Sequence, residues 1–193
     1  LEVATAQAAE MRTFLDEARI VSVPSTDRAV VKESPPFMRW NSAFLSAAGP
    51  FEAKDLPSFY YISPPDPSWP EAVQRDYIPS RHDLLFVTIH EVWPGHFLHR
   101  LHGKASSSRI AKAFCTYAMA EGWAHYAEEM MLEQGVGSGD PKVHIGQLQN
   151  ALLRNVRYLS AIGLHAKDMS LDESKQLFST KGLQDEGNAQ QQA

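Results

Sequence analysis

The sequence predicts a mainly α-helical protein with a small β-sheet near its N-terminus. Strand-like runs are confined to the first third of the chain, and long segments of helical character follow from residue 81 onward. Hydrophobic residues make up 44% and charged residues 21% of the 193 positions, which excludes a disordered chain. A chain of this length can bury a core without disulfide support.

The first third predicts two helices and two strands. Residues 3–19 are rich in Ala, Glu and Arg, which favour a helix. Residues 29–32 and 58–62 are β-branched or aromatic runs bounded by proline, and these predict strands. Between them, residues 39–49 predict a short helix that ends at Gly49.

A proline-rich stretch, residues 63–80, predicts an irregular connection to the rest of the chain. Glycine-containing segments then separate long helical segments from one another. The predicted helices span 81–102, 107–134 and 141–168, and a further one begins near Leu171 with Ser170 as its cap.

The expected organisation is one structural domain. Residues 1–80 form an N-terminal segment that packs on a helical core, residues 81–193. The chain begins at Leu1 and stops in the polar run QDEGNAQQQA, so we expect a fragment of a larger, mostly helical protein that is truncated at its C-terminus.

Composition excludes several classes of function. The 18 basic and 23 acidic residues give a net charge of −5 without a basic stripe, which excludes a nucleic-acid partner. The single cysteine, Cys115, excludes an intrachain disulfide and a cysteine-rich zinc fold. No apolar run is long enough for a membrane span. Oligomeric state and compartment stay open, with a secreted or periplasmic location slightly favoured.

A cluster of histidines marks the segment HEVWPGHFLHRLH, where four of the eight histidines lie within thirteen residues. His90 and Glu91 begin it in the manner of the zincin motif H-E-x-x-H, in which two histidines one helical turn apart bind zinc and the glutamate is the general base. Position 94 is proline instead, and the next histidine is His96. In a regular helix these two histidines would lie about 120° apart and could not share an ion.

The Pro94-Gly95 pair between the two histidines can interrupt the regular helix and so bring them together. Proline removes a helical hydrogen bond and glycine permits unusual backbone angles, so the helix is expected to bulge or end between His90 and His96. The alternative is a kinked core helix with ordinary hydrogen-bonded histidines.

A second motif, EGWAHYAEEM, places Glu121, His125 and Glu128 on one stripe of a helix. Ionisable groups on a core-facing stripe are costly unless they are paired or bind a cation. Two histidines and one glutamate form a known catalytic zinc set, and Glu121 follows His96 by 25 residues, which suits an antiparallel helix. A solvated acidic face is the alternative. The same stripe predicts that Phe114, Ala118 and Leu132 face the core.

The segment LLRNVRYLSAIGLHAKDMS could supply donors for negative charge that develops on a carbonyl oxygen. Tyr158 and His165 share one helix face, and Arg157 lies three residues after Arg154. An amphipathic core helix with surface arginines explains the same pattern. A di-iron bundle is excluded because no Glu-x-x-His motif occurs, and no G-x-S-x-G elbow supports a serine hydrolase.

Together, HEVWPGHFLHR and EGWAHYAEEM resemble the motifs of the bacterial domain-of-unknown-function 885 family, which is similar to gluzincin-type metallopeptidases. The segments FYYISPP and RYLSAIGLHAKDMSLDES extend the resemblance over most of the chain. The sequence departs from the family pattern at Ala161, where an Asp is usual, and at His99-Arg100, where a Gln is common.

The resemblance implies a zincin-like helical fold with roles for several residues. Three would bind Zn²⁺, Glu91 would be the general base, and His125 and Glu128 would support the ligands. The implied activity is zinc-dependent hydrolysis of a peptide-like substrate. Two alternatives stay open, a non-catalytic metal-binding helical domain and a metal-free helical scaffold. The implied zinc ligands are His90, His96 and Glu121, and His165 matches a histidine of the family. From the residues themselves we expect the charge donor to be His165, Tyr158 or Arg157.

Overall fold

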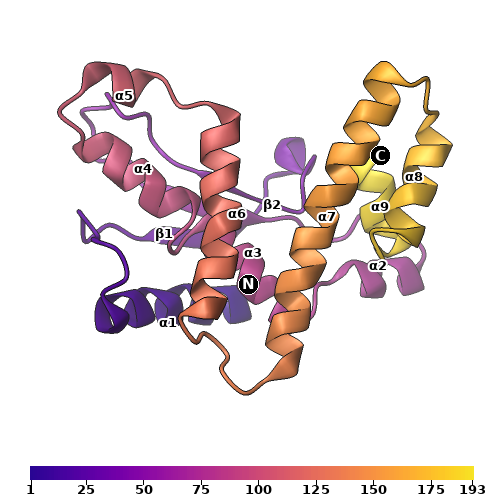
Figure 1. The fold of residues 1–193 in the computed structure, drawn as a ribbon, viewed down its shortest axis with the longest axis horizontal. Coiled ribbons are helices and arrows are strands. Elements are labelled where there is room, and N and C mark those ends of the chain that lie inside the picture. Colours follow the sequence, from indigo (N-terminus) through magenta and orange to yellow (C-terminus); the bar gives the residue numbers. More distant parts are fainter.

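The computed structural model describes residues 1–193 and confirms the mainly helical class with one small sheet near the N-terminus (Figure 1). The N-terminal part contains α1 (Glu2–Ala18), β1 (Ala29–Glu33), the 3₁₀ helix η1 (Pro36–Met38), β2 (Ala43–Ser46), β3 (Ser58–Ile62) and α2 (Glu71–Tyr77). The remainder contains α3 (Arg81–Glu91), α4 (His96–Ala105), α5 (Arg109–Ala113), α6 (Tyr117–Glu133), α7 (Pro141–Ala166), α8 (Leu171–Thr180) and α9 (Glu186–Gln192).

The sheet has the strand order β1-β3-β2. β1 runs parallel to β3, with Val30 opposite Phe59, and β2 runs antiparallel to β3, with Phe44 opposite Tyr61. β2 therefore lies at the edge of the sheet, and its outer side has no strand partner.

The helix predicted for residues 39–49 is wrong, because its centre forms β2. Trp40 stacks on Phe44 with ring centroids 5.5 Å apart, and Phe44 lies 5.3 Å from Tyr61 of the neighbouring strand. Such aromatic cross-strand pairs stabilise a strand. They outweigh the helix propensity of the Ala residues in this segment.

Helix α3 lies at the centre of the molecule, packed by α1, α6 and α7 and by the edge strand β2. Its side chains Phe86 and Ile89 are fully buried, and the main hydrophobic core joins them to Met11 of α1 and Tyr60 of β3. The core thus draws on both residues 1–80 and residues 81–193. The division of the chain at that point stays a prediction.

Two of the long predicted helices are interrupted. The segment 81–102 divides into α3 and α4, with a cis peptide bond between Trp93 and Pro94. The segment 107–134 divides into α5 and α6, and the side chain of Thr116 caps the start of α6. Phe114 lies in this second interruption and is 78% exposed, and Ala118 in the first turn of α6 is exposed as well, so the core positions expected for these two residues are wrong.

The remaining helices agree more closely with the sequence. α7 fills the segment predicted for 141–168, and Ser170 caps α8 in a capping box with Glu173. A short helix, α2, was not expected within the proline-rich stretch, where it begins directly after Pro70. No helix combines the length and the apolar character that crossing a membrane requires.

Candidate metal centre

The break between α3 and α4 positions the first two histidines. After Glu91 the chain folds back on the last turn of α3, and the Gly95 amide donates to the carbonyl of Ile89 at 3.0 Å. A Cβ at position 95 would lie 1.8 Å from the carbonyl oxygen of His90, so only glycine permits this approach. The expected interruption is therefore present, and it brings the rings of His90 and His96 to a centroid separation of 4.7 Å.

A side chain of helix α6 stabilises the break between α3 and α4. The indole nitrogen of Trp123 donates to the carbonyl of Pro94 at 2.9 Å. This bond satisfies a backbone oxygen that the helix interruption leaves without a helical partner.

His90, Glu91 and His96 form a group that could hold a metal ion. Their candidate ligand atoms all lie within 4.8 Å of one another, His90 and Glu91 are buried, and His96 is half-buried. The Oε2 atom of Glu91 is buried and has no hydrogen-bond partner. A buried carboxylate oxygen without a partner is unusual in a native fold and points to a missing cation or proton donor.

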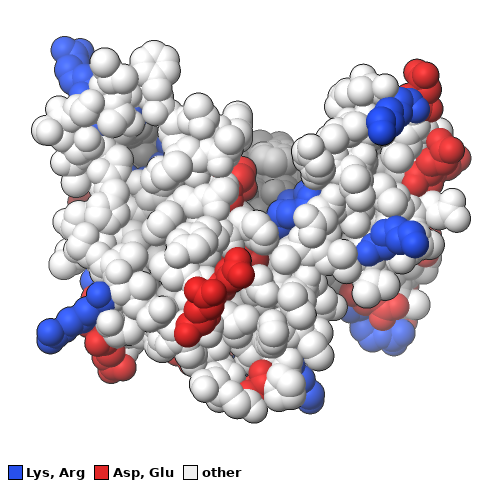
Figure 2. Space-filling view, viewed as in Figure 1, with Lys and Arg blue, Asp and Glu red and all other residues white.

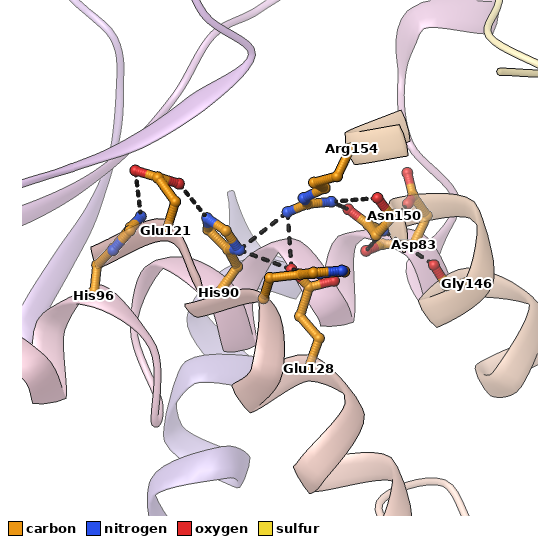
Figure 3. A network of polar contacts seen from close by, with 9 residues as sticks. Asp83, His90, His96, Glu121, Glu128, Gly146, Asn150 and Arg154 are labelled. Carbon is orange, nitrogen blue, oxygen red and sulfur yellow. Dashed lines mark hydrogen bonds and ion pairs between the residues drawn. The ribbon is translucent and has the colours of Figure 1, made fainter. Parts of the chain in front are cut away.

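Glu121 of α6 lies on the same side of both histidines. Its side chain is 56% exposed, so it is not part of the buried group, but its two oxygens lie 3.3 Å from His90 Nε2 and 3.4 Å from His96 Nε2 (Figure 3). The two histidines hold the pKa of Glu121 well below its usual range.

The opposite nitrogen of His90 faces the protein interior. Its Nδ1 lies 2.7 Å from the carboxylate of Glu128, which is fully buried on α6 (Figure 3). Because the Glu128 carboxylate can only accept, we assign the proton of the neutral ring to Nδ1, which donates a hydrogen bond to Glu128. The lone pair is then on Nε2, on the side of Glu121. Burial lowers the pKa of His90, but the nearby carboxylates of Glu121 and Glu128 outweigh it and raise that pKa above its ordinary value.

Helix α7 completes the interior side with a chain of polar contacts. Arg154 donates through Nη2 to Glu128 at 2.8 Å and through Nη1 to Asn150 Oδ1 at 2.8 Å. Asn150 in turn donates to Gly146 O and to the carboxylate of Asp83, at the start of α3 (Figure 3). Burial of Asp83 raises its pKa to about 6.

A cavity of about 630 Å³ opens on the side of the Nε2 atoms. Figure 2 shows the molecular surface hollowed between two raised parts, with acidic and basic side chains near the hollow. The walls come from β2, from the α3–α4 break, from α6 and from α7. Its charged lining residues are Glu91, Arg100, Glu121, Arg154 and Arg157.

The cavity gathers most of the side chains to which the sequence analysis assigned roles, but not all of them. His90, Glu91, His96, Glu121 and Arg157 line it. Glu128 lies behind His90, and His125 Nδ1 is 3.8 Å from Glu128, too far for a hydrogen bond. Tyr158 is 68% exposed and His165 is also exposed; neither lines the cavity.

Sequence reasoning named Arg154 only beside Arg157 in a segment that could supply a charge donor, and it gave no role to Asn150 or Asp83. A signal existed for two of them, because Asn150 and Arg154 are four residues apart and share one face of a long helix. Polar residues on a face that also buries Gly146 and Gln147 point to a network. Nothing local connects them to Asp83, which lies 67 residues earlier.

Comparisons with known proteins agree with this fold. A family model described as "Bacterial protein of unknown function (DUF885)" matches residues 1–193. A solved structure from Shewanella oneidensis, provisionally described as a lipoprotein of unknown function, has 27% identity and a TM-score of 0.76. One from Colwellia psychrerythraea, with the same kind of description, has 22% identity and a TM-score of 0.76, and supports the fold alone. No curated protein matches the chain.

The chain spans about a third of each of these solved structures. The match to the Shewanella structure includes 98% of this chain and 34% of that one. The match to the Colwellia structure includes 97% of this chain and 31% of that one.

Proposed function

The chain belongs to the DUF885 family of bacterial proteins of unknown function, and we propose that it forms the metal-site core of a zinc-dependent hydrolase of the peptidase type. One observation carries the proposal. Two histidine Nε2 atoms and the Glu121 carboxylate converge on one point at the cavity wall, beside the buried and unpartnered carboxylate of Glu91.

The distances at this point fit a metal set better than hydrogen bonds. Charge-assisted hydrogen bonds between imidazolium and carboxylate are about 2.7–2.9 Å long. His90 Nε2 lies 3.3 Å from Glu121 Oε2, and His96 Nε2 lies 3.4 Å from the other oxygen, Oε1. Ligand atoms at about 2.0–2.1 Å from a tetrahedral zinc ion lie about 3.3–3.4 Å from one another. His90, His96 and Glu121 would therefore hold the ion, and three protein ligands leave the fourth position for water or substrate, as in catalytic zinc sites.

Glu91 is the proposed general base. It follows a ligand directly in the chain, lines the cavity, and has an oxygen free of hydrogen bonds. Zinc at this site would supply Lewis acidity toward a scissile carbonyl and toward water. Glu91 would accept the proton from the attacking water and pass it to the leaving amine.

The interior contacts of His90 support this assignment. In the assigned tautomer Glu128 accepts a hydrogen bond from Nδ1–H, so Nε2 keeps its lone pair for a metal, and Arg154 holds Glu128 in place. A carboxylate behind a ligating histidine fixes the ring and its tautomer in many zinc sites. His125 stays a predicted supporting residue, since its contact with Glu128 is long.

The edge strand β2 supports a peptide-like substrate. Phe44, Leu45 and Ser46 line the cavity, and the outer side of their strand lacks a partner. An extended peptide can pair with such an edge through backbone hydrogen bonds. The strand would then lay a peptide across the cavity beside Glu91. Of the predicted charge donors, Arg157 lines this cavity, whereas Tyr158 and His165 stay predictions without a contact there.

The decisive test is Glu91→Gln in the purified protein. Glutamine keeps the shape of the side chain but cannot accept a proton, so we expect peptide hydrolysis to fall at least about 100-fold. Zinc content, measured by elemental analysis, should stay at the wild-type level. Glu129→Gln, on the exposed face of α6, is the matched control and should behave as the wild type. Activity retained in Glu91→Gln would remove Glu91 from the mechanism, and a wild type that binds no zinc would refute the metal site.

A further inference from the structure

Arg157 has hydrogen-bonding capacity that the protein itself does not use. Its Nε donates to Gln192 Oε1 at 2.6 Å, but neither terminal nitrogen has a hydrogen-bond or ion-pair partner in the chain. Arg154, one turn earlier on α7, differs, since Glu128 and Asn150 take up both of its terminal nitrogens. Three arginines line the cavity, and of the two on α7 Arg154 is bonded inward whereas Arg157 has free terminal nitrogens.

The environment of Arg157 favours an anion. The side chain is half-buried, and burial together with the neighbouring Arg154 lowers its pKa to about 10, which still leaves it protonated at neutral pH. Glu121, Glu91 and Glu128 are near enough to act on its charge, but none forms an ion pair with it, and a partly desolvated guanidinium without a direct partner is costly. The acidic groups of the same cavity are otherwise engaged, because Glu121 faces both histidines and Glu91 is buried beside them.

We propose that the free fork of Arg157 binds a carboxylate of the substrate, so that the site takes peptides carrying a carboxylate near the scissile bond. This inference rests on the proposed function and names its substrate class. A guanidinium matches a carboxylate with two parallel N–H···O bonds, which a neutral amide cannot reproduce. The carboxylate can be the C-terminus of the peptide or an Asp or Glu side chain.

The anchoring role differs in its consequences from stabilisation of a carbonyl oxyanion. A donor to the oxyanion acts on every substrate alike, so its loss lowers kcat for neutral and anionic peptides equally. An anchor acts only on peptides that carry the carboxylate, and its loss removes the preference between matched peptides. The ratio between an anionic and a neutral peptide therefore separates the two roles.

The first experiment measures binding by calorimetry in a Glu91→Gln background without added metal, so that neither hydrolysis nor zinc contributes. One peptide pair is acetyl-Ala-Ala-Phe and its C-terminal amide. The second pair, both amidated, is acetyl-Ala-Asp-Phe and acetyl-Ala-Asn-Phe. We expect the charged member of one pair to bind about 10-fold to 100-fold more tightly. The pair that shows the preference identifies the source of the carboxylate.

The preference should collapse to within about threefold when Arg157→Gln is added, and Arg157→Lys should retain part of it, because lysine keeps the charge without the fork. The control is Arg100→Gln, which removes an exposed arginine from the same cavity and should keep the preference. Circular dichroism confirms that each variant is folded. A preference that persists in Arg157→Gln, that is lost in Arg100→Gln instead, or that is absent from both wild-type pairs overturns the proposal.

Hydrolysis of the same peptides by the zinc-supplemented wild type tests the peptidase activity separately from the carboxylate-binding role of Arg157. Charge-dependent binding without hydrolysis would refute the peptidase and leave the anchor standing. Hydrolysis of charged and neutral peptides at equal kcat/KM, with no binding preference, would support the peptidase and refute the anchor.

Discussion

Two glutamates of helix α6, Glu121 and Glu128, contact the same histidine from opposite sides. They lie seven residues apart on one helical stripe, and each approaches a different ring nitrogen of His90. The side chain of Glu121 is 56% exposed at the cavity, whereas that of Glu128 is fully buried and bonded to Arg154. Each carboxyl group has a pKa below its ordinary value.

The cause of the lowered pKa differs between the two. At Glu121 the two histidines dominate, and burial opposes them without outweighing them. At Glu128 burial is the largest influence and acts in the opposite direction, so the charged form exists only because His125, His90 and Arg154 together outweigh it. The charge of Glu121 is therefore available to a cation in the cavity, whereas the charge of Glu128 is neutralised by contacts inside the protein. The pair separates a binding role from a positioning role on one helix.

Replacement of the cavity glutamate should have the largest effect on metal binding. Glu121→Gln removes a proposed ligand, and we expect zinc affinity, measured by chelator competition, to fall more than about 100-fold. The melting temperature without metal should change little, because the side chain is more than half exposed. Since binding to the native state alone stabilises it, zinc should raise the melting temperature of the wild type but not of this variant. Wild-type affinity in the variant would exclude Glu121 as a ligand.

Replacement of the interior glutamate, Glu128, should lower the stability of the protein more than its zinc affinity. Glu128→Gln leaves Arg154 without its anionic partner, and breaking a buried pair costs about 3 kcal/mol of unfolding free energy. Zinc affinity should fall only about 10-fold to 100-fold, as for other supports of a ligating histidine. Urea denaturation and chelator competition measure the two effects. If Glu121→Gln and Glu128→Gln lose the same unfolding free energy and the same zinc affinity, the two glutamates do not have separate roles.

The helix break can be tested with two glycines. Gly95→Ala places a Cβ against the carbonyl of His90, and we expect a loss of about 3 kcal/mol or more, or no folded protein. Gly122→Ala is the matched control beside Glu121, where a Cβ meets no atom within 4 Å. It should stabilise the protein by about 0.5–1 kcal/mol through helix propensity. Similar urea midpoints for both variants would show that the close turn at Gly95 is not required.

The smallest expected effect concerns the far end of the interior network. The pKa of Asp83 is raised to about 6, so between about pH 4 and 6 the folded state holds a proton that the unfolded state has lost. Stability from this group therefore falls as pH rises through that window, by about 1–3 kcal/mol. Asp83→Asn keeps an acceptor for Asn150 and should flatten that part of the stability profile. Parallel profiles for variant and wild type, from urea midpoints at pH 4 to 7, would contradict this assignment.

The spacing of the motifs predicted which segments meet at the site, and the packing of the helices determined how those segments are arranged. The Pro94-Gly95 pair in the sequence indicated that the helix could not continue to His96, and the chain indeed ends α3 at Glu91 and starts α4 at His96. Local rules were enough here, because proline and glycine act on their own backbone. The strand at Ala43–Ser46 was beyond such rules, since its aromatic partners lie on another strand.

The sequence by itself determined the helical class, the start of α8 at Ser170 and the stripe that carries Glu121, His125 and Glu128, because capping and helical periodicity are local properties. Only the tertiary structure decided which glutamate faces the cavity and which faces the interior. That outcome depends on how α6 packs against α3 and α7, which buries Glu128 against Arg154 and leaves Glu121 at the opening. A single helix stripe carries no information about its neighbours, so its periodicity could not assign these two roles.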